Sequence, residues 1–373
     1  MIQKKKKILF LHFDMKGGGA EKVLVNLVNN LDKEKYDITV QTIFGVGTHI
    51  KNLAPHIHYK SFFKKQFAGF TTFQKLFSPS LLHKFFIKEK YDLEIAYLET
   101  SPTRIVSGCK NPDTKKIAWL HITLDSFPWF RNHTEMEKAY NKFDKIVSVS
   151  QNVQNAFIQT TGLSNLPFSI QRNVVDSDSI KSQAREDVSI DIDSNKINLC
   201  YIGRLVPHKD PMRLLKAINN IKKRGFSNWH LYFLGTGELE SDIRTYIEHN
   251  SLVQDVTMLG YQQNPYKYIA RMSLYVCPSH AEGYSTAATE ALILGVPVFT
   301  TNCGGMEEIL EGGKFGKIVP DKDKDFENDL EQILRDKELY NHYKDMAQKR
   351  SPFFSKETII KENECLISSI LKN

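Results

Sequence analysis

The chain lacks the cysteine spacing of disulfide-rich and zinc-binding proteins. Its 373 residues include five cysteines, which lie far apart and form no C-x-x-C pair: Cys109, Cys200, Cys277, Cys303 and Cys365. This spacing favours reduced thiols in a reducing compartment. No apolar run is long enough to cross a bilayer, because the longest one, residues 291–299, is interrupted by Gly295 and Pro297.

The N-terminal residues resemble a signal peptide only briefly. Lys4 to Lys7 precede the apolar residues 8–13, but Asp14 and Lys16 limit the run to six residues. A secretory segment needs a longer apolar region. We therefore interpret residues 8–13 as a buried first strand and expect a cytoplasmic protein.

Acidic residues are missing between Asp37 and Glu89. Residues 1–180 hold 25 Lys and Arg against 16 Asp and Glu, whereas residues 181–373 hold 25 against 27, and the net charge of the chain is +7. A basic first half suggests a polyanion or an anionic membrane surface as a partner. Because no recognised nucleic-acid-binding module is present, we expect no nucleic acid partner.

Strand-length apolar runs alternate with segments of helical period throughout the chain. This pattern predicts an α/β fold with parallel sheets, and the length favours two doubly wound domains that face each other across a cleft. Residues 176–196 are polar and have no sustained period, so we expect a linker there. We predict domains at 1–180 and 181–352, and a last helix in 353–373 that crosses back to the first domain.

The most informative block lies between Cys277 and Glu308. An apolar run ends at Cys277, a loop carries Glu282, and a helical segment carries Glu290. Two carboxylates and a helix N-terminus therefore lie at one strand end, where open parallel sheets bind ligands.

Glycine turns and cations follow other strands. Residues 17–19 are three glycines between the first strand and the first helix, where bare amides can approach a phosphate or sugar. A tight strand-to-helix turn is the plainer interpretation. A nicotinamide-binding domain is disfavoured, because the acid that holds the ribose after the second strand is missing.

A cationic pair follows the first strand of the second half. Gly203, Arg204 and Leu205 come directly after apolar residues 197–202, and Lys209 follows. Such a pair can neutralise a diphosphate, although solvated surface residues would look the same. Residues 235–237, Gly-Thr-Gly, form another turn of this kind after the next strand.

Together these motifs resemble glycosyltransferase family 4. The resemblance rests on residues 17–21, on Gly203 to Leu205 with Lys209, and above all on the E-G-x6-E-A-x3-G-x-P-V frame that begins at Glu282. It implies the GT-B fold, a nucleotide-sugar donor and retention of anomeric configuration.

The resemblance also implies roles for individual residues, which the following list gives. Arg204 and Lys209 match the pair that binds the diphosphate; Glu282 matches the carboxylate at the donor sugar; Gly283, Tyr284 and Ser285 match the loop at sugar and phosphate; Glu290 matches the acid at the ribose; Gly17 and Gly18 match the first domain's loop; and His121 matches the active-site histidine. A hydrogen-bonded wall residue is the plainer interpretation of His121.

Three departures from the family pattern leave the donor sugar open. Ser285 stands where glycine is common, Val174 replaces the glycine of an Asn-Gly-Val-Asp turn, and Asp210 follows Lys209 in place of glycine.

The implied reaction needs no metal. It builds negative charge on the departing diphosphate, which Arg204 and Lys209 can stabilise. In the mechanism proposed for related retaining enzymes, the acceptor attacks the face that the diphosphate leaves. We expect no metal cofactor, because the D-x-D patterns at 176–178, 191–193 and 321–325 lie in polar loops or near a helix start.

Residues 59–90 are rich in lysine and phenylalanine. The spacing from Phe63 to Phe77 is close to helical, which predicts an aromatic side and a cationic side. We expect this segment to dock the enzyme on the inner face of the cytoplasmic membrane. The alternative is a phenylalanine stripe packed on the first sheet.

We therefore expect a retaining hexosyltransferase of bacterial surface polysaccharide biosynthesis, such as capsule or lipopolysaccharide assembly. It would move a sugar from a UDP-sugar to a lipid-linked or saccharide acceptor. The alternatives are a nucleotide-sugar epimerase of the same architecture and a non-catalytic nucleotide-sugar-binding protein.

Overall fold

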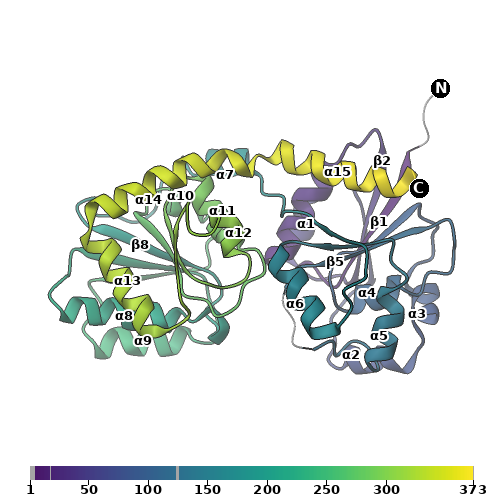
Figure 1. Cartoon of the computed structure of the whole chain (residues 1–373), viewed down its shortest axis with the longest axis horizontal. Helices are drawn as coiled ribbons and strands as arrows, with labels where there is room; N and C mark the ends of the chain where they lie inside the picture. Colours follow the sequence, from purple (N-terminus) through teal and green to yellow (C-terminus); the bar gives the residue numbers. More distant parts are fainter. Residues whose placement is uncertain (1–4, 17, 123–125, 373) are drawn as a thin grey trace. The chain divides into compact units, whose positions relative to one another are not determined.

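The computed structural model describes residues 5–16, 18–122 and 126–372 and divides the chain into two compact units (Figure 1). The first unit comprises Met1–Val174 and Glu357–Asn373, and the second comprises Val175–Lys356. Within the described ranges, no helix has both the length and the apolar character needed to cross a membrane.

The first unit is built on a seven-stranded parallel sheet with the order β3-β2-β1-β4-β5-β6-β7. Its strands are β1 (Lys6–His12), β2 (Tyr36–Phe44), β3 (His58–Phe63), β4 (Leu93–Ala96), β5 (Lys115–Leu120), β6 (Lys145–Ser148) and β7 (Phe168–Ile170). Its helices are α1 (Gly19–Asn30), α2 (Phe70–Phe73), α3 (Pro79–Phe86), α4 (Ser101–Val106), α5 (His133–Tyr140), α6 (Gln151–Thr161) and the short 3₁₀ helices η1 (Thr48–Asn52) and η2 (Gln74–Leu76).

The second unit has a six-stranded parallel sheet with the order β10-β9-β8-β11-β12-β13. Its strands are β8 (Ile197–Ile202), β9 (Trp229–Leu234), β10 (Val256–Gly260), β11 (Leu274–Cys277), β12 (Val298–Thr301) and β13 (Lys317–Val319). Its helices are α7 (Ser177–Gln183), α8 (Pro211–Lys223), α9 (Glu240–His249), α10 (Tyr266–Ile269), α11 (Thr286–Ile293), α12 (Met306–Leu310), α13 (Asp323–Arg335), α14 (Lys337–Arg350), η3 (Pro207–Lys209) and η4 (Ser351–Phe354).

The central strands are buried apolar runs, as the sequence pattern predicts for parallel sheets. In β1 the first two residues are exposed and the remaining five are buried. Helix α8 begins where Pro211 occupies the first turn and the Asp210 side chain accepts a hydrogen bond from the Arg213 amide. Its apolar face and that of α13 pack into one core with the central strands. The predicted α/β class is therefore confirmed.

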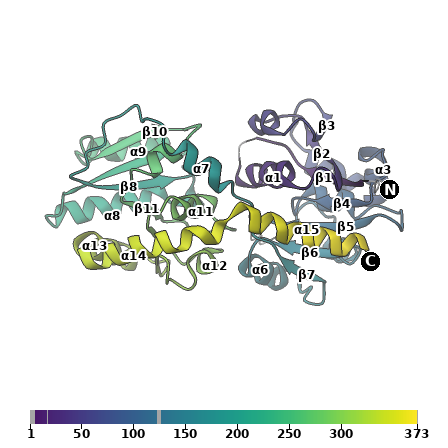
Figure 2. The ribbon, with the colours of Figure 1, turned by 90° about the horizontal axis from the view of Figure 1, so that it is seen from above.

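The last helix, α15 (Lys356–Lys372), packs on the first unit from Glu357 onward. The Asp32 amide donates to Glu364 Oε1 at 2.8 Å, and the hydroxyls of Tyr36 and Ser368 are 3.0 Å apart. Both views draw this helix beside α1 and the sheet of that unit (Figures 1 and 2). These contacts hold the C-terminal segment to α1 and β2.

One prediction of local structure is wrong. The helical spacing from Phe63 to Phe77 does not form one helix, because Phe63 ends the edge strand β3 and Gly69 adopts a left-handed conformation with φ of 82° before α2 begins. Several of the phenylalanines pack on one another and on Phe44 of β2, with ring centroids 5.3 to 5.6 Å apart for the Phe63 and Phe70 contacts with Phe44. Part of the segment therefore follows the alternative, a phenylalanine cluster on the sheet.

Candidate active site

The carboxyl ends of β8 and β11 form the first candidate site. These strands are neighbours at the centre of the second sheet, and the chain leaves β8 towards β9 on one side and β11 towards β12 on the other. Open parallel sheets bind ligands at such a switch point, outside the carboxyl ends of the strands. The loops that follow the two strands carry Arg204, Lys209 and Glu282.

Glycines allow the loops after β8 and β9 to lie backbone against backbone. Gly203 and Gly235 have φ values of 155° and 137°, and a Cβ on Gly235 would overlap the Gly203 carbonyl. The Leu205 amide donates to the Thr236 carbonyl at 3.0 Å. A side chain at Gly235 would push this loop away from the strand end.

Lys209 and Glu282 form an ion pair between the two loops. Lys209 Nζ lies 2.5 Å from Glu282 Oε2, and both side chains are mostly buried. The other oxygen, Glu282 Oε1, accepts a hydrogen bond from Ser279 Oγ at 2.9 Å. The structure thus brings together two of the predicted site residues and adds Ser279, which sequence reasoning missed.

Further contacts hold the two loops against each other. The His280 amide donates to the His208 carbonyl at 2.9 Å, and the His280 ring lies between the carboxylates of Asp210 and Asp321. Arg204 is exposed on the same loop as Lys209. Burial lowers the pKa of His208, and the positive charges of Lys209 and Arg204 lower it further, while Glu282 and Glu238 oppose the shift.

The N-terminus of α11 points its first amides at the same edge. Ser285 is the cap, and its hydroxyl accepts from the Ala288 amide at 3.3 Å. The Gly305 amide donates to the Gly283 carbonyl at 2.7 Å, and Gly304, with φ of 54°, packs against the Glu282 backbone. Serine at position 285 is therefore compatible with this loop because it caps the helix.

Glu290 lies within α11 and is buried. Its Oε1 is 3.5 Å from the Tyr266 hydroxyl, and Tyr284 is buried in the loop before the helix. Glu290 therefore lies on the helix that follows β11 and the Glu282 loop. The predicted role of Glu290 at the ribose stays a prediction.

The second candidate site lies in the first unit, at the carboxyl ends of β1, β4 and β5. Here β1 and β4 are the neighbours from which the chain leaves in opposite directions. His12 ends β1, Glu99 follows β4, and His121 follows β5. Gly17 lies outside the described residues. Gly18 caps α1 with φ of −84°, a conformation open to any residue, and a Cβ there would meet only the flexible Glu21 carboxylate.

His121 is buried against an aromatic ring and has a free nitrogen. Its ring centroid is 4.6 Å from that of Tyr97, and among the described residues its Nε2 has no hydrogen-bond partner. Burial, with a smaller contribution from His12, lowers the pKa of His121 to about 3, so the imidazole is neutral. A neutral imidazole at a sheet edge can accept or donate one hydrogen bond to a bound hydroxyl.

Glu99 holds the backbone of the His121 loop. Its two oxygens accept hydrogen bonds from the amides of His121 and Ile122 at 3.1 and 2.9 Å. Burial raises the pKa of Glu99 to about 7, and the backbone hydrogen bonds oppose this shift. The sequence signal for this residue is the position of Glu99 shortly after the buried strand β4.

His12 is the second residue that sequence reasoning missed at this edge. It is 1% exposed, and its Nδ1 donates a hydrogen bond to the Asp14 carbonyl at 2.6 Å. Its Nε2 has no partner within the described part of the chain. Two buried imidazoles, each with a nitrogen that has no partner among the described residues, thus lie at this edge of the first sheet.

Comparison with known proteins matches both units of the chain to glycosyltransferase family models. Residues 17–179 match the model described as Glycosyltransferase Family 4, and residues 182–350 match the model described as Glycosyl transferases group 1. The two matches together span nearly the whole chain.

Two named bacterial relatives match parts of the chain. A Campylobacter jejuni protein, named N-acetylgalactosamine-N,N'-diacetylbacillosaminyl-diphospho-undecaprenol 4-alpha-N-acetylgalactosaminyltransferase, is 28% identical over 225 residues, which are 60% of each chain. A Staphylococcus aureus protein, named capsular polysaccharide biosynthesis glycosyltransferase CapM, is 30% identical over 176 residues, which are 46% of each chain. The matched segments thus span less than two thirds of these relatives.

A solved structure extends the comparison to the whole fold. HepE from Anabaena, in complex with UDP and glucose, has a TM-score of 0.76 and 21% identity, and the likeness covers 98% of this chain and 100% of that one. It confirms the predicted GT-B fold of two Rossmann-like domains.

Proposed function

We propose that this chain, which belongs to glycosyltransferase family 4, transfers a hexose from a UDP-sugar to a lipid-linked or saccharide acceptor, with retention of configuration, in bacterial surface polysaccharide biosynthesis. The observation that carries the proposal is the Lys209–Glu282 pair beside Arg204 and the α11 N-terminus. The support from relatives is that one is named for an undecaprenol diphosphate-linked substrate and one for capsule biosynthesis.

The cations and the helix N-terminus suit a diphosphate leaving group. As the bond to the anomeric carbon breaks, negative charge grows on the diphosphate, and interactions stronger in that state accelerate the reaction. Lys209 would exchange its contact with Glu282 for a phosphate oxygen when the donor binds. Glu282, held by Ser279, would then be free to accept from a sugar hydroxyl. We expect this step to need no metal ion.

Retention without a covalent intermediate fits the carboxylates of the two candidate sites. A double displacement needs a carboxylate at the anomeric carbon, within about 3 Å. In the proposed donor complex Glu282 is held by Ser279 and accepts from a sugar hydroxyl, and Glu99 accepts from two backbone amides. We therefore favour attack by the acceptor on the face that the diphosphate leaves, with the diphosphate taking the proton and His121 binding a substrate hydroxyl.

A membrane-bound acceptor fits the exposed part of residues 59–90. Five large apolar side chains of this segment are between 42% and 73% exposed: Phe67, Phe73, Leu76, Leu81 and Phe85. Lys64, Lys65, Lys84 and Lys88 are exposed in the same segment. We propose that these residues dock the enzyme on anionic lipid at the inner face of the cytoplasmic membrane.

Vesicle binding tests the docking proposal. The double variant Lys64→Glu/Lys65→Glu should bind vesicles containing anionic lipid much more weakly than the wild type. Lys60→Glu is less informative, because Lys60 pairs with Glu89 at 2.7 Å. A double charge reversal at the exposed Lys216 and Lys223 on α8 provides the control and should bind as the wild type does. Equal binding of the Lys64/Lys65 variant and the wild type would refute docking through this segment.

Release of UDP from a panel of nucleotide sugars tests the function itself. We expect one UDP-sugar to release UDP rapidly only when a membrane extract supplies acceptor. An epimerase would interconvert the sugar without releasing UDP, and a binding protein would retain the donor unchanged. Either result would contradict transfer.

A further inference from the structure

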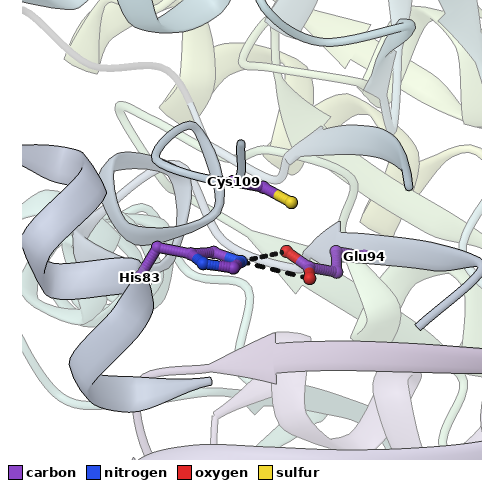
Figure 3. Close-up of side chains that lie close together, drawn as sticks. All are labelled: His83, Glu94 and Cys109. Carbon is purple, nitrogen blue, oxygen red and sulfur yellow. Dashed lines mark hydrogen bonds and ion pairs between the residues drawn. The ribbon is translucent and has the colours of Figure 1, made fainter. Parts of the chain in front are cut away.

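Three side chains with different metal-binding atoms converge in the first unit, away from both candidate sites (Figure 3). They are His83 on α3, Glu94 in β4 and Cys109, which follows α4. One ligand atom from each lies within 4.8 Å of the other two. His83 Nε2 is 2.8 and 3.1 Å from the two Glu94 oxygens, and Figure 3 shows the Cys109 sulfur directed at the same point.

The backbone holds these three residues together. A Cβ on Gly108 would overlap the Pro79 backbone, so the turn that carries Cys109 packs directly on the start of α3. The Gly108 and Cys109 amides donate to Ile105 and Val106 at 3.0 Å, which fixes the thiol at the end of α4. The cluster therefore rests on close packing between two helices and a central strand.

We propose that His83, Glu94 and Cys109 bind a zinc ion, with water as the fourth ligand. Imidazole, carboxylate and thiolate are the donors that zinc takes in proteins, whereas magnesium and calcium prefer oxygen alone. In a tetrahedral zinc site the ligand atoms are about 3.3 to 3.8 Å apart, given bonds of about 2.0 to 2.3 Å. The His83–Glu94 distances of 2.8 and 3.1 Å are shorter than this range, so zinc would replace the hydrogen-bonding proton between these two side chains and move them slightly apart.

A proton is the competitor for this position. Glu94 is 2% exposed and needs a cationic partner, which a protonated His83 supplies as a buried ion pair. That pair neutralises only the carboxylate. A zinc ion neutralises the carboxylate and a Cys109 thiolate together and uses all three donors.

The position of the cluster indicates a structural role. Glu94 lies near the start of β4, whereas Glu99 follows the end of that strand at the ligand-binding edge. Zinc here would fasten α3, which carries the exposed Leu81 and Phe85, to the sheet. The proposal is independent of the transfer reaction and of the expected metal-free chemistry.

Cobalt titration of the metal-stripped, reduced full-length chain tests the site. Thiolate ligation gives Co²⁺ a charge-transfer absorption, and we expect it to saturate at one equivalent and to be reversed by Zn²⁺. Cys109→Ser should abolish the band, and His83→Gln should weaken Co²⁺ binding at least 10-fold. Cys365→Ser, which removes an exposed cysteine on α15, is the matched control and should titrate as the wild type does.

Two results would overturn the proposal. One is the absence of a charge-transfer band in the wild type. The other is an unchanged band in Cys109→Ser. That result would assign the metal to other thiols, such as Cys277 and Cys303, which contact each other in the second unit. Thermal unfolding gives a second readout, because zinc should raise the Tm of the wild type and of Cys365→Ser but not that of Cys109→Ser.

Discussion

The two sheet edges differ in how they carry charge. The edge of the second unit presents an ion pair, an exposed arginine and a helix N-terminus. The edge of the first unit presents the neutral imidazole of His121 and a buried carboxyl whose pKa is raised to about 7. One edge suits a charged phosphate group, and the other suits hydroxyl groups that need directional hydrogen bonds.

Removing either member of the charged pair should give the largest effect. Lys209→Ala and Glu282→Ala should each lower kcat/KM for transfer by about 10²- to 10³-fold, because each removes a group that acts on the departing diphosphate or the sugar. The double variant should lose less than the product of the two effects, because the residues are in contact. UDP release with the preferred donor and acceptor measures this.

An exposed ion pair in the same unit is the control. Lys314 and Glu311 are 2.9 Å apart at the surface, and Lys314→Ala should keep wild-type activity. Near wild-type turnover in both Lys209→Ala and Glu282→Ala would refute the assignment of the charged edge.

The neutral edge should respond to loss of the His121 imidazole. His121→Asn should lower kcat about 10²-fold, because the free Nε2 would no longer bind a substrate hydroxyl. Since burial lowers the pKa of His121 to about 3, its imidazole should add no inflection to the pH–rate profile between about pH 5 and 9. Exposed His56 offers a control in His56→Asn. An inflection near pH 6.5 that disappears in His121→Asn would show that the edge carries charge.

Glu99 should make the stability of the first unit depend on pH. Its pKa rises from an ordinary value of 4.5 to about 7 on folding, so the folded chain holds the proton more tightly than the unfolded chain. The resulting contribution to the free energy of unfolding is complete below about pH 4.5 and is lost as the pH rises to about 7. The loss should reach about 3 kcal/mol.

Glu99→Gln removes this titration while keeping one acceptor oxygen for the His121 loop. Urea unfolding of the two proteins between pH 4.5 and 8 should show the wild type losing free energy of unfolding relative to Glu99→Gln. Below pH 6.5 the wild type and the variant share the titration of His121, whose lowered pKa destabilises both as the pH falls, so the comparison cancels it. Parallel curves would mean that Glu99 has an ordinary pKa.

The smallest effect should come from the cap of α11. Ser285→Ala should lower the free energy of unfolding by about 1 kcal/mol, because the Ala288 amide loses its acceptor, whereas Ser285→Gly should lower it by only a few tenths. Denaturant unfolding measures both. A larger loss for glycine than for alanine would show that the hydroxyl does not act as a cap.

The sequence predicted those site residues that can be placed by their position after a strand. Lys209 and Glu282 each follow an apolar strand, so a parallel sheet places them at one edge. Their ion pair was not predictable, because it requires β8 and β11 to be neighbours, which spacing along the chain does not reveal. Serine at position 285 looked like a departure from the family pattern, and its capping hydrogen bond gives it a physical reason.

The sequence did not reveal features that depend on burial or on irregular backbone. His12 and Glu99 are distinguished from other polar residues by their burial, which the sequence does not show. The edge strands β3 and β7 are short and half exposed, so their patterns carry little signal. The zinc ligands His83, Glu94 and Cys109 come from three elements, without the close spacing that marks a metal site in a sequence.

A structure of the chain with an intact UDP-sugar tests the central claim most directly. The account predicts the diphosphate within hydrogen-bonding distance of Arg204 and Lys209, with the Lys209–Glu282 contact broken and Glu282 directed at the sugar. A donor bound elsewhere, with the Lys209–Glu282 pair intact and Arg204 in solvent, would contradict it.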